Sequence, residues 1–156
     1  MLSETVESVQ TRAPKERPPP PPMLKPVPGA EDRFYFEGWE RRQLLVQRCR
    51  ACGQLRHPPR PWCPSCRDPL WDPLEVSGLG EVYSFVIPRK PSPAAMLPFP
   101  IVALVALTEG VRMVANLVGI EPEDVRIGLR VQLEFAETGD GFLLPLFRPQ
   151  VEPTSP

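Results

Sequence analysis

The chain has 156 residues, of which 42% are hydrophobic and 24% are charged, and its formal net charge at pH 7 is −1. This composition is typical of a globular domain, and the near-neutral charge excludes a general attraction to nucleic acid or to an anionic membrane. No apolar run approaches the ~18 residues that a membrane-spanning helix needs. Residues 1–12 also lack the apolar core of a secretory signal. We therefore expect a cytoplasmic protein with no membrane partner.

Proline is frequent, with 24 residues, and many of them lie between Pro14 and Pro28. Residues 1–30 are polar and have no hydrophobic periodicity, so they bury too little apolar surface to offset the entropy lost on ordering. We expect this segment to be a disordered, proline-rich linker with polyproline-II character, joining the chain to a further domain. The remaining prolines interrupt the chain too often for long helices and favour a mostly β fold.

Residues 31–46 are predicted to form an N-terminal helix, from about Arg33 to Leu44, and the beginning of a strand. Asp32 stands where a side chain can cap the helix. The aromatic residues of this segment can pack on the chain's own ribbon or barrel, or they can anchor a partner subunit, because aromatic side chains are favoured at interfaces. They are Phe34, Tyr35, Phe36 and Trp39.

Residues 47–72 contain all four cysteines, as two C-x-x-C pairs with ten residues between them: Cys49 and Cys52, then Cys63 and Cys66. This spacing can bring four thiolates to one tetrahedral centre, as in a zinc ribbon. Disulfides are an alternative, but they suit secreted domains, and no export signal is present. A rubredoxin-type iron site also competes, because a four-cysteine shell alone does not separate the two metals. We predict structural Zn²⁺, since four protein ligands leave no open position for catalysis.

Two other residues of this segment have predicted roles. Gly53 directly follows the second cysteine and suits the left-handed turn that a metal-binding knuckle needs there. His57 is the only histidine of the chain. With four cysteines available, we interpret it as a loop or supporting residue and not as a ligand.

Residues 73–150 change to short strands separated by turn signals. The first strand is expected from Glu75 to Pro88, with a bulge or sharp bend at the glycines of residues 77–80. Residues 101–107 are continuously apolar, as in a strand that is covered on both faces. Further strands are expected at 111–118, 131–136 and 142–147, with a helical turn at 121–124 and a tail at 151–156. The predicted fold class is mostly β, with an N-terminal helix, a rubredoxin-like zinc ribbon and a five-stranded OB-fold barrel.

The sequence contains no recognisable catalytic constellation. The cysteines are committed to the metal, the serines have no histidine partner other than His57, and no two acidic residues are placed as an acid–base pair. We do not expect this chain to be an enzyme by itself.

Binding of single-stranded nucleic acid is the alternative function. Arginines and a tryptophan gather around the ribbon, and a basic groove with stacking aromatics is what such binding requires. The barrel, which should carry the binding face, instead has many acidic residues. The arginines can equally meet an acidic protein surface or the phosphates of a coenzyme. They are Arg41, Arg42, Arg48, Arg50, Arg56, Arg60 and Arg67, with Trp62 among them.

Several motifs together resemble the DUF35 family of zinc-ribbon, OB-fold, acyl-CoA-associated proteins. The resemblance covers roughly residues 32–149. One departure is at the front, where such proteins often have a helical hairpin and this chain has one helix behind a proline-rich linker. The motifs are FYFEGW at 34–39, LVQRCRACG at 45–53, HPPR at 57–60, CPSC at 63–66, GLGEVYS at 78–84 and PLFRP at 145–149.

The resemblance implies a partner more than a reaction. Members of the family are commonly encoded or fused with thiolase-like enzymes that act on acyl-CoA, and serve as scaffold or substrate-shaping subunits. The linker is similar to the joint between a MaoC-like hydratase domain and a DUF35 domain in actinobacterial steroid side-chain degradation. There a thiolase-fold, lipid-transfer-type partner completes an aldolase. It cleaves a steroid side-chain CoA thioester by a retro-aldol reaction, releasing propionyl-CoA and a 17-ketosteroid.

From this resemblance we expect a non-catalytic accessory subunit. The catalytic residues would lie on the thiolase-like chain, with two copies of each chain in a heterotetramer. The aromatic helix and the ribbon would dock the partner. Arg89 and Lys90, in the loop between the first two barrel strands, are candidate contacts to the CoA phosphates because their charge suits a phosphate. The alternative for this loop is a hairpin tip with solvated charges.

Overall fold

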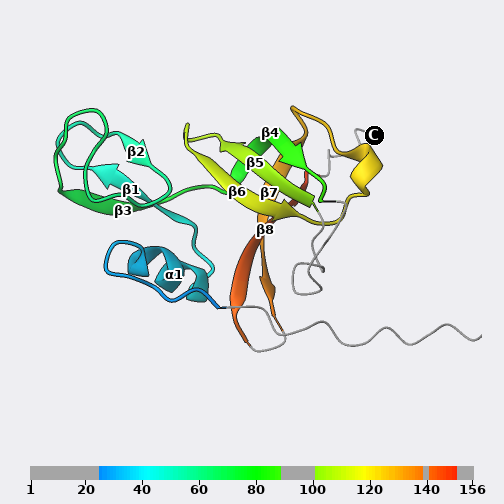
Figure 1. Cartoon of the computed structure of the whole chain (residues 1–156), viewed down its shortest axis with the longest axis horizontal. Coiled ribbons are helices and arrows are strands. Elements are labelled where there is room, and N and C mark those ends of the chain that lie inside the picture. The colour runs from blue at the N-terminus through cyan, green and yellow to red at the C-terminus, as the bar shows by residue number, and fades with distance from the viewer. Residues whose placement is uncertain (1–24, 89–100, 139–140, 151–156) are drawn as a thin grey trace, which may run out of the picture.

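The computed structural model describes residues 25–88, 101–138 and 141–150. This part of the chain contains one α-helix, a three-stranded sheet and a closed five-stranded barrel (Figure 1). None of its helices is long and apolar enough to cross a bilayer. The predicted fold class is confirmed. The elements are α1 (Arg33–Glu40), β1 (Leu45–Cys49), β2 (Leu55–Arg56), β3 (Trp71–Glu75), β4 (Leu79–Val86), β5 (Ile101–Leu107), β6 (Arg112–Leu117), η2 (Pro122–Asp124), β7 (Arg130–Glu137) and β8 (Leu143–Pro149).

The three-stranded sheet forms the ribbon, in the order β2–β1–β3, with both pairings antiparallel. Gln47 of β1 lies opposite Arg56 of β2, and Cys49 of β1 lies opposite Trp71 of β3. Cys49 ends β1, and the other three cysteines lie in the turns and loops that connect these strands. The ribbon is therefore a small sheet whose ends are shaped by the metal-binding knuckles.

The barrel closes in the order β4–β5–β6–β8–β7. All neighbours are antiparallel except β6 and β8, which run parallel. Its interior is filled by apolar side chains from every strand, and Val82, Val105, Val131 and Phe147 are fully buried. A closed barrel of five strands with this order is the OB-fold.

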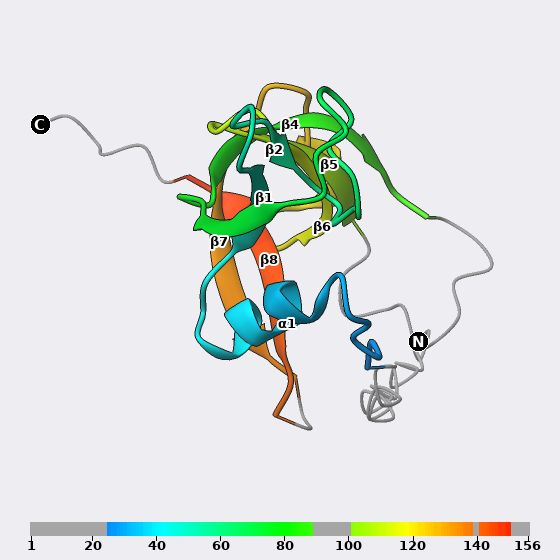
Figure 2. The same cartoon turned by 90° about the vertical axis from the view of Figure 1, so that its left-hand side faces the viewer.

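Helix α1 joins the two parts. It lies beside the ribbon sheet and along the β7–β8 hairpin, which extends beyond the rest of the barrel (Figures 1 and 2). Phe34 packs on Trp71 of the ribbon with ring centroids 4.5 Å apart. Trp39 packs on Phe142, at the start of β8, at 5.7 Å. The helix therefore fixes the position of the ribbon relative to the barrel.

The predicted helix end and cap are wrong. The helix ends at Glu40 and not at Leu44, because Arg42 has a left-handed backbone (φ 58°) and Gln43 donates its N–H to the Gly38 carbonyl. Asp32 precedes the helix but makes no side-chain cap. Its carboxylate instead accepts the backbone N–H of Gly29 at 2.6 Å.

The single strand predicted from Glu75 to Pro88 is also wrong. Its beginning belongs to β3, which pairs with β1 in the ribbon, and the remainder is β4 of the barrel. The chain turns between them at Gly78, which has φ 72° and lies against Leu133. A bulge or a sharp bend was predicted at the glycines. The chain changes from one sheet to the other at Gly78, and the register shift lies just after the glycines, between Val82 and Ser84.

The prediction that residues 101–107 are covered on both faces holds for one face only. Ile101, Ala103, Val105 and Leu107 are buried in the barrel, whereas the alternate residues are half-buried. The outward face of β5 is apolar and is only partly covered by the described residues.

Candidate metal centre and adjoining surfaces

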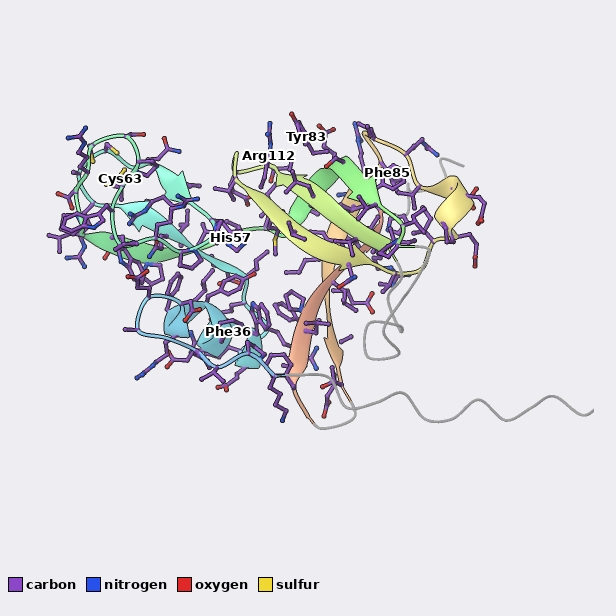
Figure 3. The ribbon with its side chains drawn as sticks, viewed as in Figure 1. Phe36, His57, Cys63, Tyr83, Phe85 and Arg112 are labelled. Atoms are coloured by element: carbon purple, nitrogen blue, oxygen red, sulfur yellow. The ribbon has the colours of Figure 1, made fainter. Side chains whose placement is uncertain are left out.

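The four cysteines gather at the end of the ribbon that lies away from the barrel, where Figure 3 labels Cys63. Their sulfur atoms all lie within 4.8 Å of one another, with Cys49 Sγ 3.5 Å from Cys66 Sγ and Cys52 Sγ 3.6 Å from Cys63 Sγ. These distances are too long for disulfides, whose sulfurs are about 2.05 Å apart. Four sulfurs bound about 2.3 Å from a tetrahedral metal are about 3.8 Å apart. The cluster fits a structural metal.

The two knuckles have the same backbone hydrogen bonds. Cys49 accepts the N–H of Gly53 at 3.0 Å, and Cys63 accepts the N–H of Arg67 at 2.9 Å. Cys49 and Cys63 each donate their own N–H to a carbonyl five residues on, both at 3.0 Å. Gly53 has φ 74°, which confirms the predicted left-handed turn. These hydrogen bonds give the backbone of the two knuckles the same shape.

The electrostatics of the cluster favour a cation. Hydrogen bonds from the backbone N–H of Cys66 and of Ser65, against the opposing effect of burial, lower the pKa of the Cys63 thiol to about 6. The backbone N–H of Asp68 acts to lower the pKa of Cys66, but burial and the hydrogen bonds with the other cysteines outweigh it and raise that pKa to about 12. Four thiolates cannot coexist at this distance without a positive charge among them, and a bound metal supplies it.

His57 lies outside the cysteine cluster, as the sequence predicted. Its ring packs on Tyr35 with centroids 5.1 Å apart, between the ribbon and α1 (Figure 3). Burial lowers the pKa of His57 to about 4, so the imidazole is neutral at pH 7. It supports the junction between helix and ribbon.

The aromatic residues of α1 are used mainly within the chain. Tyr35 and Trp39 are each 8% exposed, and their rings pack edge to face at 5.0 Å. Phe34 and Phe36 are half-buried. Phe36 and Trp39 line an apolar groove of ≈ 290 Å³ that also borders β6 and β8. Whether Phe34, Tyr35, Phe36 and Trp39 contact a partner stays a prediction.

The structure reveals an exposed apolar surface that sequence analysis did not single out. It lies on the outward face of β4, β5 and β6, and we call it the outer barrel face. Tyr83, Val86 and Val114 are 46%, 60% and 66% exposed there. Val114 lies opposite the half-buried Leu104. The continuous apolar run of residues 101–107 was the available signal, because half of its side chains point away from the core. Arg89 and Lys90 lie outside the described residues.

A four-cysteine ribbon joined to a closed OB-fold barrel defines the class of protein. Residues 36–72 match the family described as "ChsH2, rubredoxin-like zinc ribbon domain", and residues 74–136 match "ChsH2, C-terminal OB-fold domain". A "DUF35 domain-containing scaffold protein" of Methanocaldococcus jannaschii is 33% identical over 118 residues, which are 70% of this chain and 84% of that protein. The chain belongs to the DUF35 family.

A solved structure described as "Ltp2-ChsH2(DUF35) aldolase" is similar to this chain, with a TM-score of 0.74 and 46% identity. The match covers 81% of this chain and 100% of that one. A DUF35 structure from Sulfolobus solfataricus, at 18% identity and a TM-score of 0.56, shares the fold.

Two longer relatives carry names that refer to CoA metabolism. A protein of Thermomonospora curvata named "Probable enoyl-CoA hydratase alpha subunit" is 46% identical over 134 residues, 84% of this chain. The "3-oxo-4,17-pregnadiene-20-carboxyl-CoA hydratase alpha subunit" of Mycobacterium tuberculosis is 36% identical over 122 residues, which are 78% of this chain. The matches span only 42% and 39% of these relatives. The names of these relatives and structures do not refer to nucleic acid, and they give that alternative no support.

Proposed function

We propose that this chain is a non-catalytic accessory subunit of a thiolase-fold, lipid-transfer-type enzyme that acts on acyl-CoA. The reaction is the retro-aldol cleavage of a steroid side-chain CoA thioester, which releases propionyl-CoA and a 17-ketosteroid. The observation that carries the proposal is the 46% identity to the whole of the matched chain in the Ltp2–ChsH2(DUF35) aldolase. The steroid-CoA name of the mycobacterial relative supports the substrate class.

The histidine and the four cysteines of the described residues are already engaged in contacts within the chain. The one histidine is neutral at pH 7 and half-buried against Tyr35. The four cysteines point to one another. The catalytic groups are therefore assigned to the thiolase-like partner, and this chain to binding and positioning.

The metal is proposed to be Zn²⁺ with a structural role, held by Cys49, Cys52, Cys63 and Cys66. Four thiolates fill a tetrahedral shell and leave no position for substrate. The ribbon sheet is small, so metal binding supplies much of the free energy that folds it. Reduced thiols of this kind agree with a cytoplasmic location.

The outer barrel face is the proposed docking surface for the partner. Its exposed valines and Tyr83 do not contribute to the barrel core. Exposed apolar patches of this kind mark protein interfaces. The apolar groove beside α1 continues the same side of β6, where Val114 lines it. Phe36 extends the surface onto the helix. Two copies of each chain are proposed for the complex, because thiolase-fold enzymes are usually dimeric.

Co-purification tests this assignment. The full chain, co-expressed with its thiolase-like partner, should elute with it from a size-exclusion column. Val114→Glu should abolish co-elution, because it places a charge on the docking surface. Ile127→Glu is the matched control, because Ile127 is 70% exposed but lies on the loop after η2. Its complex should persist.

Two results would reject the proposal. In one, the wild-type chain stays monomeric beside the partner. In the other, it binds a single-stranded oligonucleotide with a steep salt dependence, which would favour the nucleic-acid function.

A further inference from the structure

Arg56 is a buried cation without a counter-charge. It lies in β2, is only 3% exposed, and its Nε, Nη1 and Nη2 atoms have no hydrogen-bond partner in the described part of the chain. An uncompensated buried charge is strongly destabilising, and buried polar groups in folded proteins are nearly always paired. The described residues therefore leave the positive charge of Arg56 uncompensated.

A second buried donor adjoins it. Gln47 lies opposite Arg56 in the β1–β2 pair and is 1% exposed. Its Oε1 accepts the backbone N–H of Arg60 at 2.9 Å, whereas its Nε2 has no partner among the described residues. All the unpaired buried atoms here are nitrogen donors. The unbalanced charge is therefore positive, and it favours an anion in the space nearby.

Arg56 lines a groove between the ribbon and the barrel, with a volume of ≈ 550 Å³. Arg60 of the ribbon and Arg112 of β6 line it too, and none of the described residues that line it is acidic. Arg112 is held over the ring of Tyr83, with its Cζ 3.7 Å from the ring centroid (Figure 3). His57 also borders the groove and carries no charge at pH 7. We call this site the basic groove.

We propose that the basic groove binds the phosphate group of a small molecule through the exposed guanidinium groups of Arg60 and Arg112, while the buried charge of Arg56 behind them makes the groove more positive. Three positive charges along one groove match a dianionic phosphate better than a single carboxylate. The groove is larger than an inorganic phosphate, so it can take a phosphorylated molecule. Free phosphate and the phosphate of a nucleotide are two sources of the same chemistry. Only the nucleotide end of an acyl-CoA, as a particular source, rests on the function proposed above.

Calorimetric titration of the full, metal-loaded chain tests the proposal, in a buffer free of phosphate and sulfate. The probes are inorganic phosphate, adenosine 3′,5′-bisphosphate and acetate. Phosphate and the bisphosphate should bind, with affinity falling as NaCl rises, and acetate should not. Equal affinity for the first two identifies free phosphate as the ligand; tighter binding of the bisphosphate identifies a nucleotide.

Arg60→Gln, Arg112→Gln and Arg56→Met should each weaken phosphate binding by about tenfold, the first two by removing a contact and the third by removing a buried positive charge. Arg126→Gln is the control, because Arg126 is exposed and does not line the groove. Phosphate should also raise the Tm of the wild type by more than that of Arg56→Met. Without phosphate, Arg56→Met should be as stable as the wild type or more so, because it removes an unpaired buried charge.

The proposal would be overturned if neither phosphate probe bound the wild type, if acetate bound as well as phosphate, or if the Arg56→Met and Arg126→Gln variants bound phosphate alike. These readouts do not use the thiolase-like partner. Failure of co-elution would reject the proposed function while leaving the phosphate site intact.

Discussion

Gly53 and Arg67 occupy equivalent positions in the two metal-binding knuckles. Each directly follows the second cysteine of its pair, donates its N–H to the carbonyl of the first, and has a left-handed backbone, with φ of 74° and 64°. An L-residue pays about 1–2 kcal/mol in this conformation, and glycine does not. The two knuckles are thus built alike, but only one has the residue that suits the turn.

Substitutions at these two positions should therefore change stability with opposite signs. Arg67→Gly should raise the free energy of unfolding by about 0.5–1 kcal/mol, because it relieves the left-handed strain. Gly53→Ala should lower the free energy of unfolding by about 1 kcal/mol. The space around Gly53 is open, so the cost comes only from the left-handed backbone conformation. Urea unfolding with metal in excess measures both values. Changes of the same sign would contradict the equivalence of the knuckles.

Removal of the metal should unfold the ribbon. Chelation, or the change Cys49→Ser, should expose the amides of β1–β3 to hydrogen exchange while those of β5–β7 stay protected, because the barrel has its own core. Elemental analysis should give one zinc per chain. A red, iron-containing protein would overturn the zinc assignment, and lost activity with a protected ribbon would argue for a catalytic metal.

The stability of the chain should fall in mild acid because of His57. Its pKa in the folded chain is about 4, below the ordinary value of 6.5, so the unfolded chain binds the proton more readily. The stabilisation is complete above pH 6.5 and is lost as the pH falls towards 4, by up to about 3 kcal/mol. His57→Leu should remove this part of the pH dependence. Acid also releases metal from both proteins. The test therefore compares the slope of the unfolding free energy against pH in the wild type with that in His57→Leu. Identical slopes would contradict the prediction.

Gly80 should tolerate no side chain, for a reason unlike that at Gly53. A Cβ there would lie 2.5 Å from the carbonyl oxygen of Ala106, in the backbone of the paired strand β5. Gly80→Ala should cost about 1–3 kcal/mol, because a backbone group cannot give way as a side chain does. Gly110→Ala, with φ 87° and open space, should cost about 1 kcal/mol. Thermal unfolding of the two variants checks the order, and a reversed order would refute it.

The sequence was informative where the signal was local. The spacing of the cysteines predicted the metal cluster, and strand alternation with turn residues predicted the barrel. The sequence was misleading where contacts between distant residues determine the structure. Strand β3 is separate from β4 because it pairs with β1, and hydrophobic periodicity does not reveal that pairing. Arg56 was one of seven arginines around the ribbon in the sequence. Only the pairing of β2 with β1 shows that it is buried.

The most direct test of the central claim is the release of propionyl-CoA from a steroid side-chain CoA thioester, measured with this chain and its thiolase-like partner together and with each alone. The accessory-subunit assignment predicts release only when both chains are present. Undiminished release by the partner alone, or release by this chain alone, would contradict it.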